Sequence, residues 1–220
     1  MANPHPTPVI AVIGDVVASR QLPPQRRAEL QGQLDAAMQT INTRYRAAVL
    51  ADFLVTIGDE FQGILDDPAV FPDIVQDLRE DIPGIGFRLV ASRGMLSTEL
   101  RPAALGTDGP AWHAARARME SIRSATRDGV GFAGFGGDDA LLQALGDLLT
   151  WHWNHLVETQ RSAVAALRRS RGSKKIVAET LGISQQSLSN RAQSAGWREY
   201  DAGLTAWREV LGRHAPRGAS

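Results

Sequence analysis

Carboxylates stand in this sequence at two places where an apolar strand pattern ends. Asp15 follows the run VIAVIG, and Asp59 and Glu60 are adjacent in VTIGDEFQGIL. Carboxylates that converge repel one another unless a cation lies between them. Oxygen ligands of this kind suit Mg²⁺ or Mn²⁺ bound together with a phosphate group. We therefore predict a divalent metal site formed by Asp15, Asp59 and Glu60, with ordinary acidic turn chemistry as the alternative.

The first half of the chain alternates between strand and helix patterns that would position these carboxylates. Apolar β-branched runs predict strands, and apolar residues spaced by three and four predict helices. The order βαββαβ, followed by αβ, predicts an α+β fold of the ferredoxin-like type with an antiparallel sheet under helices. In that topology Asp15 lies beside the hairpin that carries Asp59. The strands are expected at 9–13, 53–57, 61–65, 85–91 and 130–135, and the helices at 30–45, from Pro68, and at 111–124.

The two ends of the chain differ in charge. Residues 1–150 carry 13 Lys and Arg against 19 Asp and Glu, whereas residues 151–220 carry 11 against 5. A basic half suggests a polyanionic partner, although surface variation would give the same numbers. We expect a domain at 1–138, a connecting helix at 139–170 that breaks near Gly146 or Trp151, and an all-α domain at 171–220.

The segment from Lys174 to Trp197 has the pattern of a helix-turn-helix. Gly182 permits a left-handed turn, and Ser184 is a suitable N-cap for the second helix. Amide and guanidinium side chains on that helix match base edges in the major groove of double-stranded DNA, while lysines before it suit phosphates. Dimer packing is the alternative use. The candidate DNA-binding residues are Lys174, Lys175, Ser184, Gln185, Gln186, Ser187, Ser189, Asn190 and Arg191, with Arg171 beside them.

Composition excludes several classes of protein. The chain has no cysteine, so disulfides and thiolate metal sites are excluded. The start MANPHPTP lacks the pattern of a secretory signal, and no apolar run reaches the roughly 20 residues that span a bilayer. We expect a soluble, cytoplasmic protein without a membrane partner.

Some motifs resemble class III nucleotidyl cyclases. VIGDVVASR and VTIGDEFQG are similar to the two metal-binding stretches of those enzymes, and GDEF is similar to the signature of diguanylate cyclases, which have the same palm-type fold. The resemblance implies metal positions at Asp15 and Asp59 and a transition-state arginine at Arg116. It departs at Trp112, where cyclases carry an Asn, and at Val55 and Thr56, near which they carry a base-selecting Lys.

Two further residues are candidates for the site. Arg20 follows the first strand and has the reach and geometry to bind a phosphate bidentately, unless it is a solvated loop arginine. His113 is a candidate donor or general acid–base, with a packing or capping role as the alternative. Arg116 and His113 are thus the candidate catalytic residues, and Arg20 and Arg116 the candidate phosphate ligands.

The motif set as a whole resembles the SatD family. GDVVASR, GDEFQG and GTDGPAWHAAR, followed by a helix-turn-helix, cover nearly the whole chain. The main hypothesis is a DNA-binding regulator, expected to be a homodimer, whose cyclase-like domain binds a divalent metal and a nucleotide or other phosphate ligand. The alternatives are a divergent metal-dependent nucleotidyl cyclase or related phosphotransferase and, third, a plain scaffold.

Overall fold

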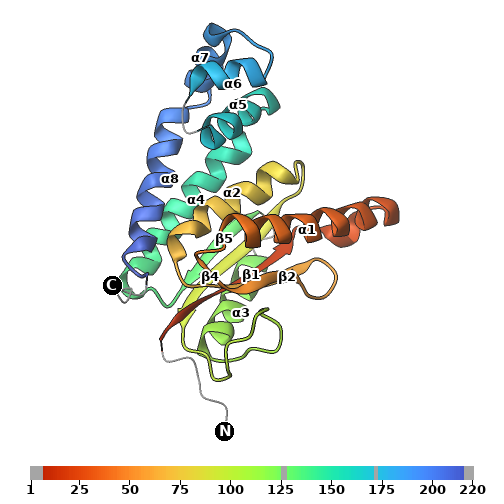
Figure 1. Cartoon of the computed structure of the whole chain (residues 1–220), viewed down its shortest axis with the longest axis vertical. Coiled ribbons are helices and arrows are strands. Elements are labelled where there is room, and N and C mark those ends of the chain that lie inside the picture. Colours follow the sequence, from red (N-terminus) through yellow and green to blue (C-terminus); the bar gives the residue numbers. More distant parts are fainter. Residues whose placement is uncertain (1–6, 125–127, 171–172, 216–220) are drawn as a thin grey trace. The chain divides into compact units, whose positions relative to one another are not determined.

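The computed structural model describes residues 7–124, 128–170 and 173–215, which form two compact units (Figure 1). The first unit contains the described residues up to Gly146 together with those from Trp207 onward. The second unit is Asp147–Ala206. The two units end at other residues than the predicted segments 1–138, 139–170 and 171–220, and the assignment of 171–220 as a DNA-binding domain stays a prediction. Arg171, a candidate phosphate contact, lies outside the described residues.

A five-stranded mixed sheet forms the centre of the first unit. Its order is β2-β3-β1-β4-β5, in which the first four strands are antiparallel to their neighbours and β5 is parallel to β4. β1 is buried along its whole length, as its continuous apolar run requires. The antiparallel pairing predicted for the βαββαβ part is present, and the fifth strand, for which the sequence predicted no direction, is parallel to β4. The strands are β1 (Val9–Val16), β2 (Val49–Val55), β3 (Glu60–Leu65), β4 (Phe87–Gly94) and β5 (Gly129–Ala133).

Helices cover both faces of this sheet. Figure 1 shows α1 and α2 on one face and α3 on the other. Pro68 begins a short 3₁₀ turn rather than the helix itself, because the Asp67 carboxylate caps that turn by accepting from the backbone N–H of Ala69. The helices and turns are α1 (Pro24–Arg44), α2 (Phe71–Asp81), α3 (Pro110–Arg123), η1 (Ser19–Gln21), η2 (Pro68–Val70) and η3 (Gly136–Asp138).

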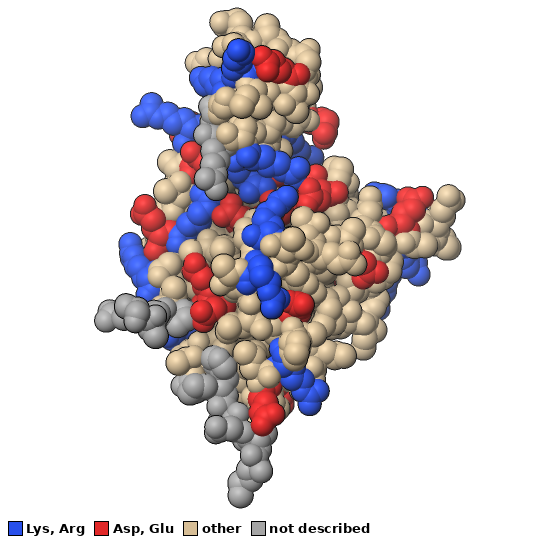
Figure 2. Space-filling model, in the orientation of Figure 1, with Lys and Arg blue, Asp and Glu red and all other residues tan. Residues whose placement is uncertain are grey.

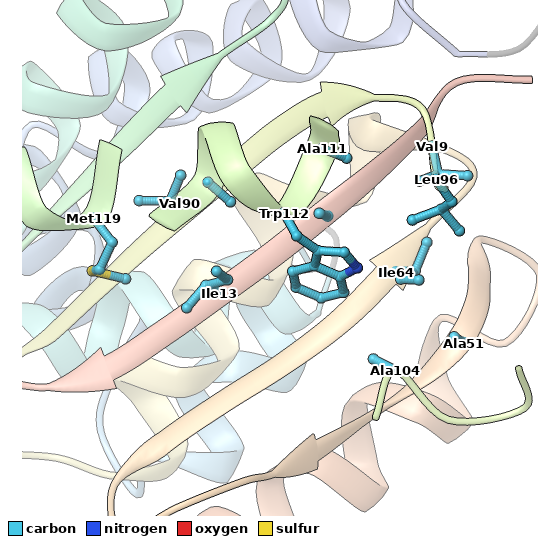
Figure 3. Packing of buried hydrophobic residues seen from close by; sticks show 12 residues of the cluster. Val9, Ile13, Ala51, Ile64, Val90, Leu96, Ala104, Ala111, Trp112 and Met119 are labelled. Atoms are coloured by element: carbon cyan, nitrogen blue, oxygen red, sulfur yellow. The ribbon is translucent and has the colours of Figure 1, made fainter. Parts of the chain in front are cut away.

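Trp112 anchors α3 to the sheet. Its indole is fully buried among Ile13, Ile64 and Val90 of the strands and Met119 of its own helix (Figure 3). The indole Nε1 donates to the hydroxyl of Thr107 at 3.0 Å, which satisfies its polar atom. The residue that departs from the cyclase pattern is therefore part of the core, and it fixes the helix that follows.

Gly14 lets an aromatic ring lie across the central strand. A Cβ built at Gly14 would come within 2.1 Å of the Phe61 ring on β3. Any side chain at this position would displace that ring, so the glycine allows the two strands to close tightly just before Asp15.

The second unit is entirely helical. α4 is continuous through Gly146 and Trp151, so the predicted break is wrong; the helix ends at His155. A small apolar core joins α5, α6 and α7 through residues such as Leu167, Val177 and Leu188. The helices from here to the end of the chain are α4 (Asp139–His155), α5 (Glu158–Arg169), α6 (Lys174–Thr180), α7 (Gln185–Ser194) and α8 (Trp197–Gly212), of which α4 and α8 belong in part to the first unit.

The α+β class predicted from the sequence is confirmed. Each predicted strand is present, although β2 begins at Val49 rather than Phe53, because alternating buried residues pair with β3 along the earlier part. In the described part of the chain, no helix has both the length and the apolar character needed to cross a membrane.

Candidate functional site

Strand register brings Asp15 together with Glu60 and Arg88. Asp15 pairs with Glu60 of β3 on one side and with Arg88 of β4 on the other. Residues paired across adjacent strands point to the same face of a sheet, here the face that α3 covers. The Asp15 side chain is only 7% exposed. The sequence predicted that Asp15 would meet the acidic hairpin, and Glu60 is the acidic residue that pairs with it.

Arg123, the last residue of α3, lies between these carboxylates. Its Nε donates to Oδ2 of Asp15 at 2.7 Å, and its Nη2 donates to Oε1 of Glu60 at 2.5 Å. Its Nη1 donates to Oε1 of Glu120 at 2.9 Å. Arg88 donates from Nη1 to the other Asp15 oxygen at 3.3 Å. Both oxygens of Asp15 are therefore bound by arginines.

The charges of this cluster stabilise one another. Burial lowers the pKa of Arg123, but the hydrogen bonds and charges of Asp15 and Glu60 outweigh burial and raise the pKa above its ordinary value. The contribution of this cluster to the stability of the fold is therefore complete below the ordinary pKa of arginine. It is lost only as the pH rises through the raised pKa of Arg123, far above neutrality. Arg123 is a permanent cation of this site.

Asp59 faces a different neighbour. It precedes β3 in a turn where Gly58 has a φ of 69°, and its Oδ2 accepts from the hydroxyl of Ser19 at 2.5 Å. Ser19 lies in the loop after β1, in which Ala18 adopts the left-handed conformation with φ 56°. The tip of the β2–β3 hairpin is thus tied to the loop after β1, which also carries Arg20.

Three adjoining pockets surround the hairpin, and Glu60 lines all of them. The first, of about 400 Å³, contains equal numbers of carboxylates and arginines. The second, of about 490 Å³, runs along α3 and includes Arg116. The third, of about 410 Å³, runs along α1 and includes Leu30. The charged residues of the first, called here the mixed-charge pocket, are Asp15, Asp59, Glu60, Arg20, Arg88 and Arg123.

Side chains of both charges also lie next to one another on the surface of the molecule that Figure 2 shows. Figure 2 shows acidic and basic side chains next to one another on the face in view, without a broad area of one sign. On the face in view, polyanion binding would therefore depend on particular side chains rather than on a broad area of positive charge.

The candidate phosphate and catalytic residues divide between these pockets. Arg20 is exposed and lines both the mixed-charge pocket and the α1 pocket. Arg116 lines the α3 pocket, with Nη1 3.8 Å from an oxygen of Asp108. His113 is exposed, places Nε2 3.2 Å from the same carboxylate, and is absent from the lining of these three pockets. The structure therefore brings Arg20 and Arg116 to the hairpin but not His113.

The mixed-charge pocket fits an arginine better than a resident cation. Both Asp15 oxygens and Oε1 of Glu60 accept from guanidinium groups. Within the described ranges, no three His, Cys, Asp or Glu side chains are grouped as a metal site. The divalent metal therefore stays a prediction, and in this arrangement Arg123 occupies the space between the two facing carboxylates.

In the second unit, α6 and α7 present the predicted DNA-binding residues. Ser184 caps α7, since its hydroxyl oxygen accepts from the backbone N–H of Ser187 at 3.1 Å. Gln186 donates from Nε2 to Oδ1 of Asn190 at 3.1 Å, one turn further along the helix. The side chains that are exposed are those of Lys174, Lys175, Ser184, Gln185, Gln186 and Asn190, and those that are half-buried are Ser187, Ser189 and Arg191.

Comparison with known proteins identifies the family. The SatD family model matches residues 9–206. This chain belongs to the SatD family.

Solved structures similar to this SatD-family chain are distant from it. One is the guanylyl cyclase Cya2, with 14% identity, a TM-score of 0.43, and coverage of 60% of this chain and 76% of that chain. Another is a regulator of polyketide synthase expression from Bifidobacterium adolescentis, with 15% identity, a TM-score of 0.28, and coverage of 96% and 82%. No curated protein matches the chain.

Sequence reasoning missed the two arginines that hold Asp15. Arg88 had a signal, because it stands inside the apolar strand pattern IGFRLVA, where a charge requires a partner. Arg123 had none, since an arginine in the last turn of a helix is commonplace. Its role depends on where α3 ends relative to β1, which the SatD-family motifs do not specify.

Proposed function

We propose that this SatD-family chain is a DNA-binding transcriptional regulator whose first unit binds a nucleotide or another phosphate ligand, with a divalent cation that enters with the ligand's phosphates. The observation that carries the proposal is the convergence of Arg20, Arg88 and Arg123 on one pocket at the hairpin. Guanidinium groups bind phosphate oxygens through paired N–H donors.

The mixed-charge pocket has donors left for such a ligand. Arg20 takes part in none of the arginine–carboxylate pairs described above, and it faces solvent. The Nε of Arg88 is buried and has no hydrogen-bond partner in the described structure. Because Arg88 Nε is shielded from solvent, the donors that an anion entering the pocket reaches first are those of the exposed Arg20.

The neighbouring α3 pocket supports a nucleoside rather than a bare phosphate. It joins the mixed-charge pocket through Glu60 and Arg123, and its wall combines the apolar Phe61 and Met119 with the polar Gln62. Sites of 300–1,000 Å³, mostly apolar with a few polar groups, are typical for small ligands, and this pocket is about 490 Å³. A phosphate at the arginines and a base beside α3 would occupy both.

The ferredoxin-like, cyclase-type arrangement is part of the same proposal. The order β2-β3-β1-β4 with antiparallel neighbours supports it, and β5 extends the sheet.

The DNA-binding role rests on the second unit. Gly182 has a φ of 62°, which suits a tight turn between α6 and α7, and Ser184 starts α7 as a cap. Leu188 is buried on one side of α7, whereas Gln185 and Asn190 are exposed. This division supports a recognition helix of a helix-turn-helix. Because paired half-sites raise affinity, we expect a homodimer, which light scattering would measure.

A thermal-unfolding titration tests the ligand proposal. Each nucleoside triphosphate, with Mg²⁺, with Mn²⁺ and with chelator, is added to the chain and to the variants Arg20→Gln and Arg26→Gln. A ligand at 100 times its dissociation constant stabilises a fold by about 2.7 kcal/mol. We expect a shift for the wild type and Arg26→Gln, which lies outside the pockets, and a reduced shift for Arg20→Gln. The absence of any shift would refute the ligand site.

The same mixtures discriminate the enzyme from the regulator. Pyrophosphate in the wild-type mixture would favour the alternative of a divergent nucleotidyl cyclase or phosphotransferase. A shift without product, together with a change in DNA affinity when the ligand is added, would support the regulator.

A further inference from the structure

Arg123 stands where the sequence predicts a metal ion. Asp15 and Glu60 face one another on adjacent strands, and the Arg123 guanidinium donates to both, at 2.7 Å and 2.5 Å. Its third nitrogen donates to Glu120. The group that compensates the facing carboxylates is thus an arginine covalently attached to the fold.

The position of Arg123 is fixed by the packing of α3. The helix is held against the sheet by buried residues that include Ala111, Trp112 and Ala115. Arg123 ends that helix, where the partial negative charge of the helix C-terminus favours a cation. The packing of α3 thus places the backbone of Arg123 within reach of both carboxylates.

A divalent cation would compete with this guanidinium. A cation on the inner oxygens of Asp15 and Glu60 would lie within a few ångströms of Arg123, and like charges so close in a partly buried site repel strongly. Arg88 binds the second oxygen of Asp15 and adds to the repulsion. Cation and guanidinium are therefore alternatives for the same oxygens.

The charge balance follows from the same geometry. With three carboxylates and no arginine, the mixed-charge pocket would repel a phosphate group. With Arg20, Arg88 and Arg123 the six charged residues balance. An anionic ligand then meets donors rather than net negative charge.

We propose that Arg123 permanently supplies the positive charge that a metal ion would bring to Asp15 and Glu60, so that the site takes a phosphate-bearing ligand without a divalent cation on its carboxylates. The statement about the ligand rests on the proposed function. A cation associated with the ligand's own phosphates does not conflict with it. Asp15 becomes a cation ligand only when Arg123 is removed.

Mn²⁺ binding tests this inference without any nucleotide. Binding is measured as the decrease of the electron paramagnetic resonance signal of free Mn²⁺. The chains compared are the wild type, Asp15→Asn, Arg123→Gln and the double variant Arg123→Gln/Asp15→Asn. The matched control is Arg118→Gln on the same helix, whose guanidinium binds Gln143 at 2.7 Å and lines none of the three pockets.

The expected result is a new Mn²⁺ site in Arg123→Gln only. Its affinity for Mn²⁺ should exceed that of the wild type at least about tenfold, in the range by which groups around a metal ligand alter affinity. The double variant should lose the gain, and Arg118→Gln should bind Mn²⁺ as the wild type does. A wild-type site that Asp15→Asn removes would overturn the inference, as would an Arg123→Gln chain that binds no additional ion.

A second variant covers the case in which Arg123→Gln does not fold. Arg123→Lys keeps one positive charge, so it should fold and stay without a Mn²⁺ site; a site in this variant equal to that of Arg123→Gln would contradict the inference. If Arg123→Gln unfolds in chelator, addition of Mn²⁺ should restore its unfolding transition, and failure to do so counts against the proposal. These results are independent of nucleotide binding, so a failure of the proposed function is recognised separately.

Discussion

The mixed-charge pocket of the first unit and the exposed face of α7 in the second unit are both rich in polar side chains, but they differ in how those side chains are satisfied. In the pocket, Asp15 accepts from two arginines and Asp59 accepts from Ser19. On α7, Gln185 and Asn190 face solvent, and the polar contact between exposed side chains there joins Gln186 to Asn190.

Because of this difference, the polar side chains of the pocket should affect mainly the stability of the fold, and those of α7 mainly the binding of a partner. A buried charge that has partners within the fold contributes to folding, because its removal leaves those partners desolvated and unpaired. An exposed amide on a helix contributes little to folding, because water satisfies it equally well. Substitutions of the buried charges of the pocket should therefore be detected first in unfolding experiments, and substitutions of the exposed side chains on α7 first in DNA binding.

The largest expected effect is on stability, at Asp15. Asp15→Ala removes the acceptor of Arg88 and one acceptor of Arg123, and breaking a buried ion pair by removing one partner costs about 3–5 kcal/mol. Urea denaturation at neutral pH measures the loss of unfolding free energy. The matched control is Asp35→Ala, an exposed carboxylate on α1, which should change stability by less than about 0.5 kcal/mol. Equal effects of the two substitutions would remove the distinction between the regions.

The second effect is on binding, at Asn190. Asn190→Ala should weaken binding to the specific DNA site by about 1–3 kcal/mol, since an amide can bind an adenine edge through two hydrogen bonds. The unfolding free energy should change by less than about 0.5 kcal/mol, because the side chain is exposed. Fluorescence anisotropy with specific and scrambled duplexes measures the affinity. Gln193→Ala, also exposed but in the last turn of α7, is the control and should keep specific affinity.

The sequence predicted the α7 region from local signals alone. Gly182 and Ser184 mark the turn and the cap, and both features are present in the structure. Local patterns also predicted each strand of the sheet, and strand order predicted that Asp15 would face Asp59 and Glu60. The register pairs Asp15 with Glu60, whereas Asp59 accepts from Ser19. Elements with a clear period and short-range turn chemistry are therefore accessible from one sequence.

The arginines that bind the carboxylates of the pocket could not be predicted from local patterns. Arg123 meets Asp15 only because α3 has a particular length and crosses the sheet where Trp112 is buried, and both depend on packing between segments far apart in the chain. The direction of β5 was not predicted for the same reason, since the strand beside which β5 lies is decided by tertiary packing. The sequence thus identified the carboxylates but not the arginines that compensate them.

The smallest expected effect is at Ser184, and it tests whether a polar residue within the α7 region can behave like one in the pocket. The Ser184 oxygen accepts from the backbone N–H of Ser187, so Ser184→Ala leaves that group without its cap and should lower the unfolding free energy by about 1 kcal/mol. Ser184→Thr keeps the cap and should restore most of the stability. Because the cap acts on folding, specific DNA affinity of the folded chain should fall less for Ser184→Ala than for Asn190→Ala. A larger loss of affinity at Ser184 than at Asn190, with stability unchanged, would mean that this hydroxyl is needed by the DNA rather than by the helix.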